Sequence, residues 1–119
     1  MKASLPKILL HAEGLAVFFV SCALYHRLGA SWGLFALLFL APDLFMLGYL
    51  GGPAIGARCY NAVHTYTVPM AIAAGAWLAG HTLVVSLCVI WIAHIGLDRL
   101  CGYGLKYPTA FKDTHLSRV

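Results

Sequence analysis

Four long apolar runs constrain the fold of this chain more than any other feature of its sequence. They cover residues 8–26, 32–50, 58–79 and 82–100, approximately. Each run is close to the roughly 20 residues that an α-helix needs to cross the hydrocarbon core of a bilayer. The runs are continuously apolar rather than alternating, which favours helices over a β-barrel. The sequence therefore predicts a membrane protein with four spanning helices.

The composition agrees with this interpretation. Of the 119 residues, 61% are hydrophobic and only 10% are charged, and the mean hydropathy is +0.83. A soluble domain has about 25% charged residues. The links between the runs are short, which favours an up-down bundle. We expect one all-α domain over residues 1–119, with four transmembrane helices and a tail over 101–119.

Positive charge is distributed unevenly between the two sides of such a bundle. With four spans, both termini lie on one side, and that side collects seven of the eight Lys and Arg residues, leaving only Arg27 opposite. The positive-inside rule then places both termini in the cytoplasm. The basic side would contact anionic membrane lipids, so the net charge of +4 is no argument for nucleic acid. The remaining expected partners are a second copy of the chain or a larger membrane complex. The seven residues are Lys2, Lys7, Arg58, Arg99, Lys106, Lys112 and Arg118.

Proline and glycine mark two interruptions of the apolar runs. Pro42 removes a backbone hydrogen bond and predicts a kink in the second helix. Gly48, Gly52 and Gly56 recur every four residues. This pattern either brings two backbones close together or forms a flexible re-entrant turn.

Five ionisable side chains interrupt the apolar runs: Glu13, Asp43, His64, His94 and Asp98. An ionisable group in hydrocarbon costs at least a few kcal/mol, so such residues are usually functional. Counting about 1.5 Å per residue from the cytoplasmic end of each helix places the first four about 8–10 Å deep, and Asp98 about 3 Å deep. All four helices therefore contribute an ionisable group to one layer on the cytoplasmic side.

Imidazoles and carboxylates together are typical ligands of a divalent metal ion. His94 and Asp98 are four residues apart and share one face of a helix. We predict that Asp43, His64, His94 and Asp98 bind a metal, with zinc favoured over manganese or iron. Glu13 is the predicted general base, or a fifth ligand. Two other interpretations stay open for the group: a structural polar network, or a proton or ion pathway.

Further polar residues surround the predicted metal layer. Tyr60 and Asn61 lie at a shallow depth on the helix that carries His64, and Arg99 and Lys106 could bind a lipid phosphate at the interface. These four are the predicted substrate-binding residues. A second shell or a second metal ion is the expectation for His11, Asp113 and His115.

Several strings resemble one known family. They are Ala41-Pro-Asp43-Leu-Phe-Met-Leu-Gly-Tyr-Leu50, Gly56-Ala-Arg-Cys-Tyr-Asn-Ala-Val-His64-Thr-Tyr66, His94-Ile-Gly-Leu-Asp98-Arg99 and the tail from Gly102. Together they resemble a family of short bacterial four-helix membrane proteins that is described only as a domain of unknown function. The resemblance spans nearly the whole chain and implies a bacterial inner membrane, but no activity.

A second resemblance concerns the ligand order. Pro42-Asp43 followed by His64-Thr65 is similar to a pattern in membrane-bound metal-dependent hydrolases. The order Asp, His, then His-x-x-x-Asp resembles the zinc ligands of the phospholipase C/P1 nuclease superfamily. This implies that the four predicted ligands hold one metal. The chain lacks a second His-x-x-x-Glu, so the resemblance implies a mononuclear or dinuclear site.

The favoured function is therefore a membrane-embedded metal-dependent hydrolase. Its substrate would be a lipid-like phosphoester or ester at the cytoplasmic interface, because the predicted site lies about 8–10 Å below the surface. One alternative is a non-catalytic accessory or assembly subunit with a structural polar network. Another is a proton or metal-ion carrier.

Overall fold

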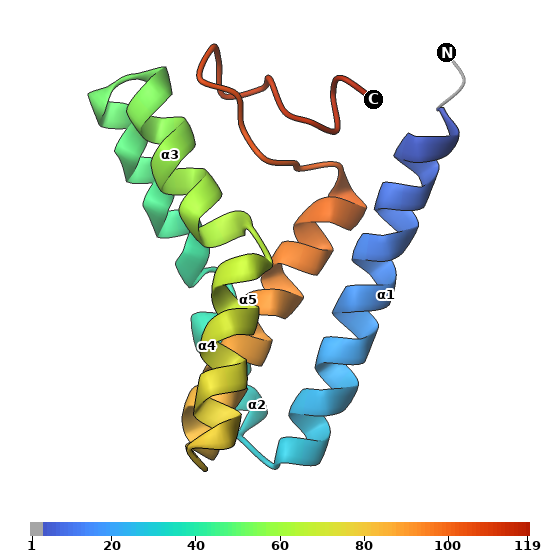
Figure 1. Cartoon of the computed structure of the whole chain (residues 1–119), viewed down its shortest axis with the longest axis vertical. Coiled ribbons are helices and arrows are strands. Elements are labelled where there is room, and N and C mark those ends of the chain that lie inside the picture. The colour runs from blue at the N-terminus through green and yellow to red at the C-terminus, as the bar shows by residue number, and fades with distance from the viewer. Residues whose placement is uncertain (1–3) are drawn as a thin grey trace.

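The computed structural model describes residues 4–119, so Lys2 lies outside the described residues. Its regular elements are all helical, as predicted, and the described chain otherwise has only an isolated bridge between Lys106 and Thr114. Successive passes of the chain run in alternating directions, and the start of the first helix lies at the same end as the C-terminal tail (Figure 1). The elements are α1 (Leu5–Leu28), α2 (Trp32–Leu38), the 3₁₀ helix η1 (Ala41–Gly51), α3 (Pro53–His64), α4 (Thr67–Leu78) and α5 (Thr82–Cys101).

Three stretches are long and apolar enough to cross a membrane: Leu5–Leu28, Trp32–Gly51 and Thr82–Cys101. They correspond to the first, second and fourth predicted spans. Large apolar side chains are exposed on these stretches, as expected where lipid covers them; Leu37 is 78% exposed and Leu44 is 67% exposed. The chain is therefore a membrane protein.

The predicted continuous helix over 58–79 is wrong. The third pass begins earlier, at Pro53, and is broken between α3 and α4, where Thr65 has an extended backbone (φ −97°, ψ 139°). Pro69 supplies the physical reason. It has no N–H to donate and its ring would clash with the carbonyl four residues before it. The break places Pro69 in the first turn of α4, where no donor is needed.

The second pass is interrupted near Pro42, where the sequence predicts a kink. The α-helix ends at Leu38, and a 3₁₀ helix starts at Ala41 with Pro42 in its first turn. A 3₁₀ helix rises about 2.0 Å per residue, against about 1.5 Å for an α-helix. The second half of this pass therefore covers more depth per residue than a continuous α-helix would.

Glycines join η1 and α3 into a tight hairpin. A Cβ atom on Gly48 would lie 2.7 Å from Cys59 Sγ, and one on Gly56 would overlap the ring of Tyr49. Gly52 lies between the two helices with φ +105°, a conformation that favours glycine. The close-approach interpretation is thus confirmed at Gly48 and Gly56, while Gly52 forms the turn.

Small residues also bring α1 against α5, and the two helices lie side by side in Figure 1. A Cβ atom on Gly14 would lie 2.6 Å from Arg99 Cβ, and one on Gly96 would lie 2.9 Å from the backbone nitrogen of Phe18. At the far end of the molecule, the buried Tyr25 donates a hydrogen bond to the Ser31 carbonyl and fixes the link from α1 to α2. α5 is thus held along its length by α1.

Candidate metal centre

Four side chains from three elements converge inside the bundle. Asp43 comes from η1, His64 from the end of α3, and His94 and Asp98 from α5. One potential ligand atom of each lies within 4.8 Å of the others. This four-residue group, the metal-ligand group, could therefore hold a metal ion. The histidine side chains are 0% and 2% exposed, whereas those of Asp43 and Asp98 are 31% and 15% exposed. The structure thus brings together the four residues that the sequence predicts as ligands.

Five of the six distances within the group are close to the edges of a tetrahedron, and the sixth, between the two carboxylate oxygens, is within 4.8 Å. His64 Nε2 lies 3.2 Å from Asp43 Oδ1 and 3.3 Å from Asp98 Oδ2. His94 Nε2 lies 3.1 Å from Asp43 Oδ1 and 3.2 Å from Asp98 Oδ2. The two Nε2 atoms are 3.1 Å apart. Four ligands at about 2.0–2.1 Å from a zinc ion are separated by about 3.3–3.4 Å, so these five edges need little adjustment to hold one.

The local geometry of the hairpin explains why Asp43 meets His64. Asp43 lies nine residues before Gly52 along a 3₁₀ helix, and His64 lies twelve residues after it along an α-helix. At about 2.0 Å and about 1.5 Å per residue, both segments cover about 18 Å. The change of helix type therefore brings the two side chains to the same depth.

The hydrogen bonds of His64 fix which of its ring nitrogens faces the group. Nδ1 lies 2.8 Å from the Tyr60 carbonyl, and because a carbonyl can only accept, Nδ1 carries the proton. In a neutral His64, Nε2 then presents a lone pair to two carboxylate oxygens and to His94 Nε2. Three acceptors therefore meet at His94 Nε2, and either a proton on that nitrogen or a metal ion among the four atoms satisfies them. The Tyr60 ring also stacks on the His64 ring, 3.7 Å between centroids and 4° from parallel.

His94 is held by packing rather than by a second hydrogen bond. Its Nδ1 atom is buried and has no hydrogen-bond partner within residues 4–119. The Phe39 ring packs edge-on against it at 5.5 Å. With no acceptor at Nδ1, the polar contacts of this side chain are concentrated at Nε2, in the four-residue group.

Two side chains of α5 satisfy the carbonyl groups that the break after α3 leaves open. Arg99 Nη2 donates to the His64 carbonyl at 2.7 Å, and Nη1 donates to the Tyr103 carbonyl at 3.0 Å. Trp91 Nε1 donates to the Val63 carbonyl at 2.5 Å. Arg99, predicted to bind substrate, here supports the backbone of a ligand residue. The contributions of Trp91 and Tyr103 were missed, although a broken helix always needs donors at its end.

The tail folds back over this end of the bundle (Figure 1). Asn61 donates to the Lys106 carbonyl at 2.8 Å and accepts from the Lys106 N–H at 2.6 Å. His115 Nδ1 accepts from the Leu105 N–H at 2.9 Å, and burial lowers the pKa of His115. Asn61, another predicted substrate-binding residue, is thus engaged with the tail backbone.

The other predicted site residues lie outside the four-residue group. Glu13 is exposed on α1. His11 Nδ1 lies 2.8 Å from the Leu100 carbonyl, between α1 and α5. Asp113 pairs with Arg118 at 2.7 Å and accepts a hydrogen bond from a neighbouring threonine, and these contacts lower the pKa of Asp113 to about 2. A catalytic role for Glu13 and a second ion at the other residues stay predictions.

A cavity of about 280 Å³ opens beside the metal-ligand group on the side of the tail. Both carboxylates border it and neither histidine does. A metal ion held here would thus be reached past Asp43 and Asp98. Its lining residues are Asp43, Met46, Tyr60, Asp98, Tyr103, Lys106 and Phe111.

The family model described as "Domain of unknown function (DUF4260)" matches residues 7–119. The chain belongs to this family. The match includes all four members of the metal-ligand group and the whole tail, and it confirms the family resemblance seen in the sequence. No curated protein and no solved structure matches the chain. The resemblance of this DUF4260 protein to metal-dependent hydrolases stays a prediction.

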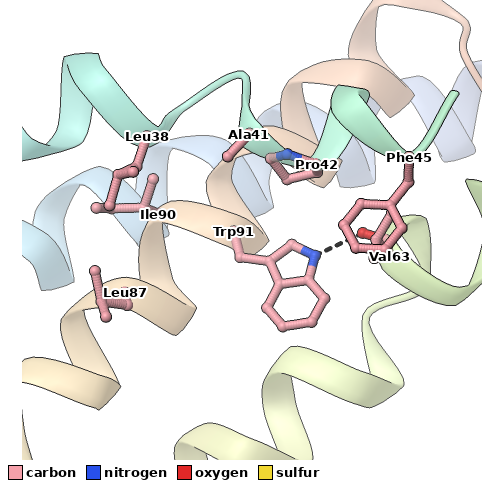
Figure 2. A pocket seen from close by; sticks show the side chains of 8 residues that line it. All are labelled: Leu38, Ala41, Pro42, Phe45, Val63, Leu87, Ile90 and Trp91. Atoms are coloured by element: carbon pink, nitrogen blue, oxygen red, sulfur yellow. Dashed lines mark hydrogen bonds between the residues drawn. The ribbon is translucent and has the colours of Figure 1, made fainter. Parts of the chain in front are cut away.

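The DUF4260 chain has a second cavity, of about 370 Å³, between the second pass, α3 and α5 (Figure 2). Its lining side chains are apolar apart from the Trp91 indole N–H, which is already bonded to the Val63 carbonyl. Pro42 and Val63 directly precede Asp43 and His64 in the chain. The ligand-bearing segments thus have an apolar cavity beside them, lined by Leu38, Ala41, Pro42, Phe45, Val63, Leu87, Ile90 and Trp91.

Proposed function

We propose that this protein is a membrane-embedded, metal-dependent hydrolase that acts on a lipid-like phosphoester or ester at the cytoplasmic interface. One observation carries the proposal. The Nε2 atoms of His64 and His94 lie 3.1 Å apart, and one oxygen of Asp43 and one of Asp98 each lie 3.1–3.3 Å from both nitrogens. Two protonated imidazoles would repel each other at this distance, whereas two neutral imidazoles that bind one metal ion lie about this far apart. Two nitrogens and two oxygens suit zinc first, with manganese or iron as alternatives.

A metal ion in this group would generate a hydroxide nucleophile and polarise the oxygen of the bond under attack. In the hydrolysis, the water oxygen bonds to phosphorus or to the carbonyl carbon, and the ester bond to the leaving alcohol breaks. The alcohol takes one proton of the water and the other passes to solvent. Asp43 and Asp98 border the cavity, so the substrate approaches on their side, while the buried histidines keep water from the opposite side. Glu13 remains the proposed base, and it would have to reach the cavity from its exposed position on α1.

The topology completes the proposal. α3 and α4 together form the third of four spans in an up-down bundle, and both termini lie in the cytoplasm of a bacterial inner membrane. The support is the distribution of Lys and Arg, together with the tail that folds over the metal-ligand group. The site then lies in the cytoplasmic leaflet, at the depth of a lipid ester.

Elemental analysis of the purified protein tests the metal. The wild type in detergent should carry one equivalent of a divalent metal, and His94→Ala should carry almost none. His81→Ala is the matched control, because His81 is exposed at the turn before α5, and it should keep the full equivalent. Folded wild-type protein that takes up no stoichiometric zinc, manganese or iron would refute the proposal.

The same variants separate the accessory-subunit alternative. If the four side chains only held the helices together, His64→Ala would lower stability without changing the metal content. Metal-dependent release of an alcohol from a chromogenic phosphodiester or carboxylic ester, absent in His94→Ala, would distinguish a hydrolase from a metal-ion carrier.

A further inference from the structure

Lys106 is buried without an ion-pair partner in the described part of the chain. The residue is 5% exposed, and its Nζ atom lies 3.9 Å from the ring centroid of Phe111 and 4.7 Å from that of Tyr60. It forms no ion pair with any residue of the described range, 4–119. Burying a charge without a partner is costly, and burial lowers the pKa of Lys106 while Asp98 raises it. Such a group needs a functional explanation.

The backbone around Lys106 is built to hold the side chain in place. Asn61 bonds both the N–H and the carbonyl of Lys106, as a neighbouring strand would. On the tail side, Lys106 forms the antiparallel bridge to Thr114. The rings of Tyr60 and Phe111 then contact the ammonium. Lys106 is therefore fixed from two sides rather than lying free on the surface.

The same cavity joins this ammonium to the metal-ligand group. Lys106, Asp43 and Asp98 all line it, and Tyr60 contacts both Lys106 and His64. A divalent ion and two carboxylates are neutral together, which leaves the charge of Lys106 unbalanced inside the cavity. Its volume of about 280 Å³ is close to the lower end of ligand pockets, about 300 Å³, which fits a small group rather than a whole lipid.

We infer that this cavity is a phosphate site, in which one phosphate group lies between the Lys106 ammonium and the metal centre. The inference rests on the proposed function and narrows its substrate from esters in general to phosphoesters. The phosphate belongs either to a lipid headgroup or to a free ion, and both have the same chemistry. Lys106 contributes the charge-assisted hydrogen bond that a carboxylic ester would not require.

The test uses the full-length protein in detergent, loaded with Co²⁺. The visible spectrum of Co²⁺ reports metal occupancy, and broadening of the ³¹P signal of inorganic phosphate reports phosphate beside the metal. Lys106→Met keeps the length of the apolar stem and should weaken phosphate binding about tenfold or more. Lys112→Met removes the same charge from an exposed position of the tail and should leave phosphate binding unchanged.

Competition then identifies the source of the phosphate. Phosphatidic acid in mixed micelles should displace inorganic phosphate if the site takes a lipid headgroup, whereas diacylglycerol should not. Displacement by neither lipid, with Lys106-dependent binding of inorganic phosphate, supports a site for the free ion. Equal binding by Lys106→Met and Lys112→Met, or no binding of either phosphate by Co²⁺-loaded protein, overturns the inference.

The proposed metal binding and the inferred phosphate binding can be refuted separately. Protein that takes up no Co²⁺ refutes the proposed function. In that case a Lys106-dependent shift of the ³¹P signal, without paramagnetic broadening, still supports the anion site. If Co²⁺ binds to Lys106→Met with unchanged spectrum, the variant is folded at the metal centre and its loss of phosphate reports on Lys106 alone.

Discussion

Asp98→Asn should change the stability of this protein in opposite directions with and without metal. Asp98 Oδ2 lies 3.3 Å from His64 Nε2 and 3.2 Å from His94 Nε2. Because His64 Nδ1 donates to the Tyr60 carbonyl, Nε2 of a neutral His64 can only accept. Without metal, the carboxylate and the imidazole are two acceptors in contact. An asparagine amide in the same place can donate to one or both imidazoles.

The magnitudes follow from these contacts. One or two new hydrogen bonds should stabilise the metal-free variant by about 1–2 kcal/mol relative to the wild type. Zinc at about 100 times its dissociation constant stabilises the wild type by about 2.7 kcal/mol. If loss of the carboxylate weakens zinc about 100-fold, the variant gains only about 0.4 kcal/mol from the same zinc. Asp98→Asn should therefore melt a few °C above the wild type in chelator and below it in zinc.

Thermal unfolding in detergent at pH 8, where free imidazoles are neutral, measures both differences. His81→Ala is again the control, because His81 is exposed at the turn before α5, and its small effect should be the same with chelator and with zinc. The reasoning is refuted if Asp98→Asn is destabilised equally in both conditions. That result would mean that Asp98 accepts hydrogen bonds from protonated imidazoles in a structural network.

Three further predictions concern residues around the site. Arg99→Lys cannot bond the two backbone carbonyls that the guanidinium holds together, and we expect zinc affinity, measured by competition with a chelator, to fall about tenfold. Gly14→Ala should lower the unfolding free energy by about 1–3 kcal/mol, because the added Cβ would collide with α5. Gly75→Ala is its control: the space around that Cβ is open, so thermal unfolding in detergent should show a free energy higher by up to about 1 kcal/mol. Burial lowers the pKa of His115, so the tail contact that it stabilises is fully present above the unfolded pKa of about 6.5 and is lost as the pH falls through the lower folded value. Hydrogen exchange at the Leu105 amide, corrected for the intrinsic rate, should therefore accelerate on acidification. This acceleration should be absent in His115→Asn. Equal acceleration in the wild type and the variant would exclude the histidine as its cause.

Depth along a helix could be predicted from the sequence, because rise per residue is a local property. It placed Asp43, His64 and His94 in one layer, and the four-residue spacing added Asp98. Rotation about the helix axis is not local, since it depends on which neighbours a helix packs against. Glu13 has the depth of the layer but lies exposed on α1, outside the group.

The break in the third pass had a local signal that a hydropathy pattern does not contain. Pro69 favours a kink or a helix start nearby, but the hydropathy of residues 58–79 contains no such signal. The contact of Asn61 with Lys106 had no such signal, because it joins residues 45 positions apart. The position of Lys106 over the cavity therefore emerges only from the folded chain.

The arrangement of the ligands has a consequence for how the protein is made. Asp43 and His64 emerge from the ribosome early, but His94 and Asp98 lie in α5, the last helix, and the tail that covers them follows. An inserting chain therefore carries Asp43 and His64 without these two partners until α5 has been translated. If the four side chains bind a metal as proposed, its loading would be a late step of biogenesis, and a chain truncated before α5 should be recognised by membrane quality-control proteases as incomplete.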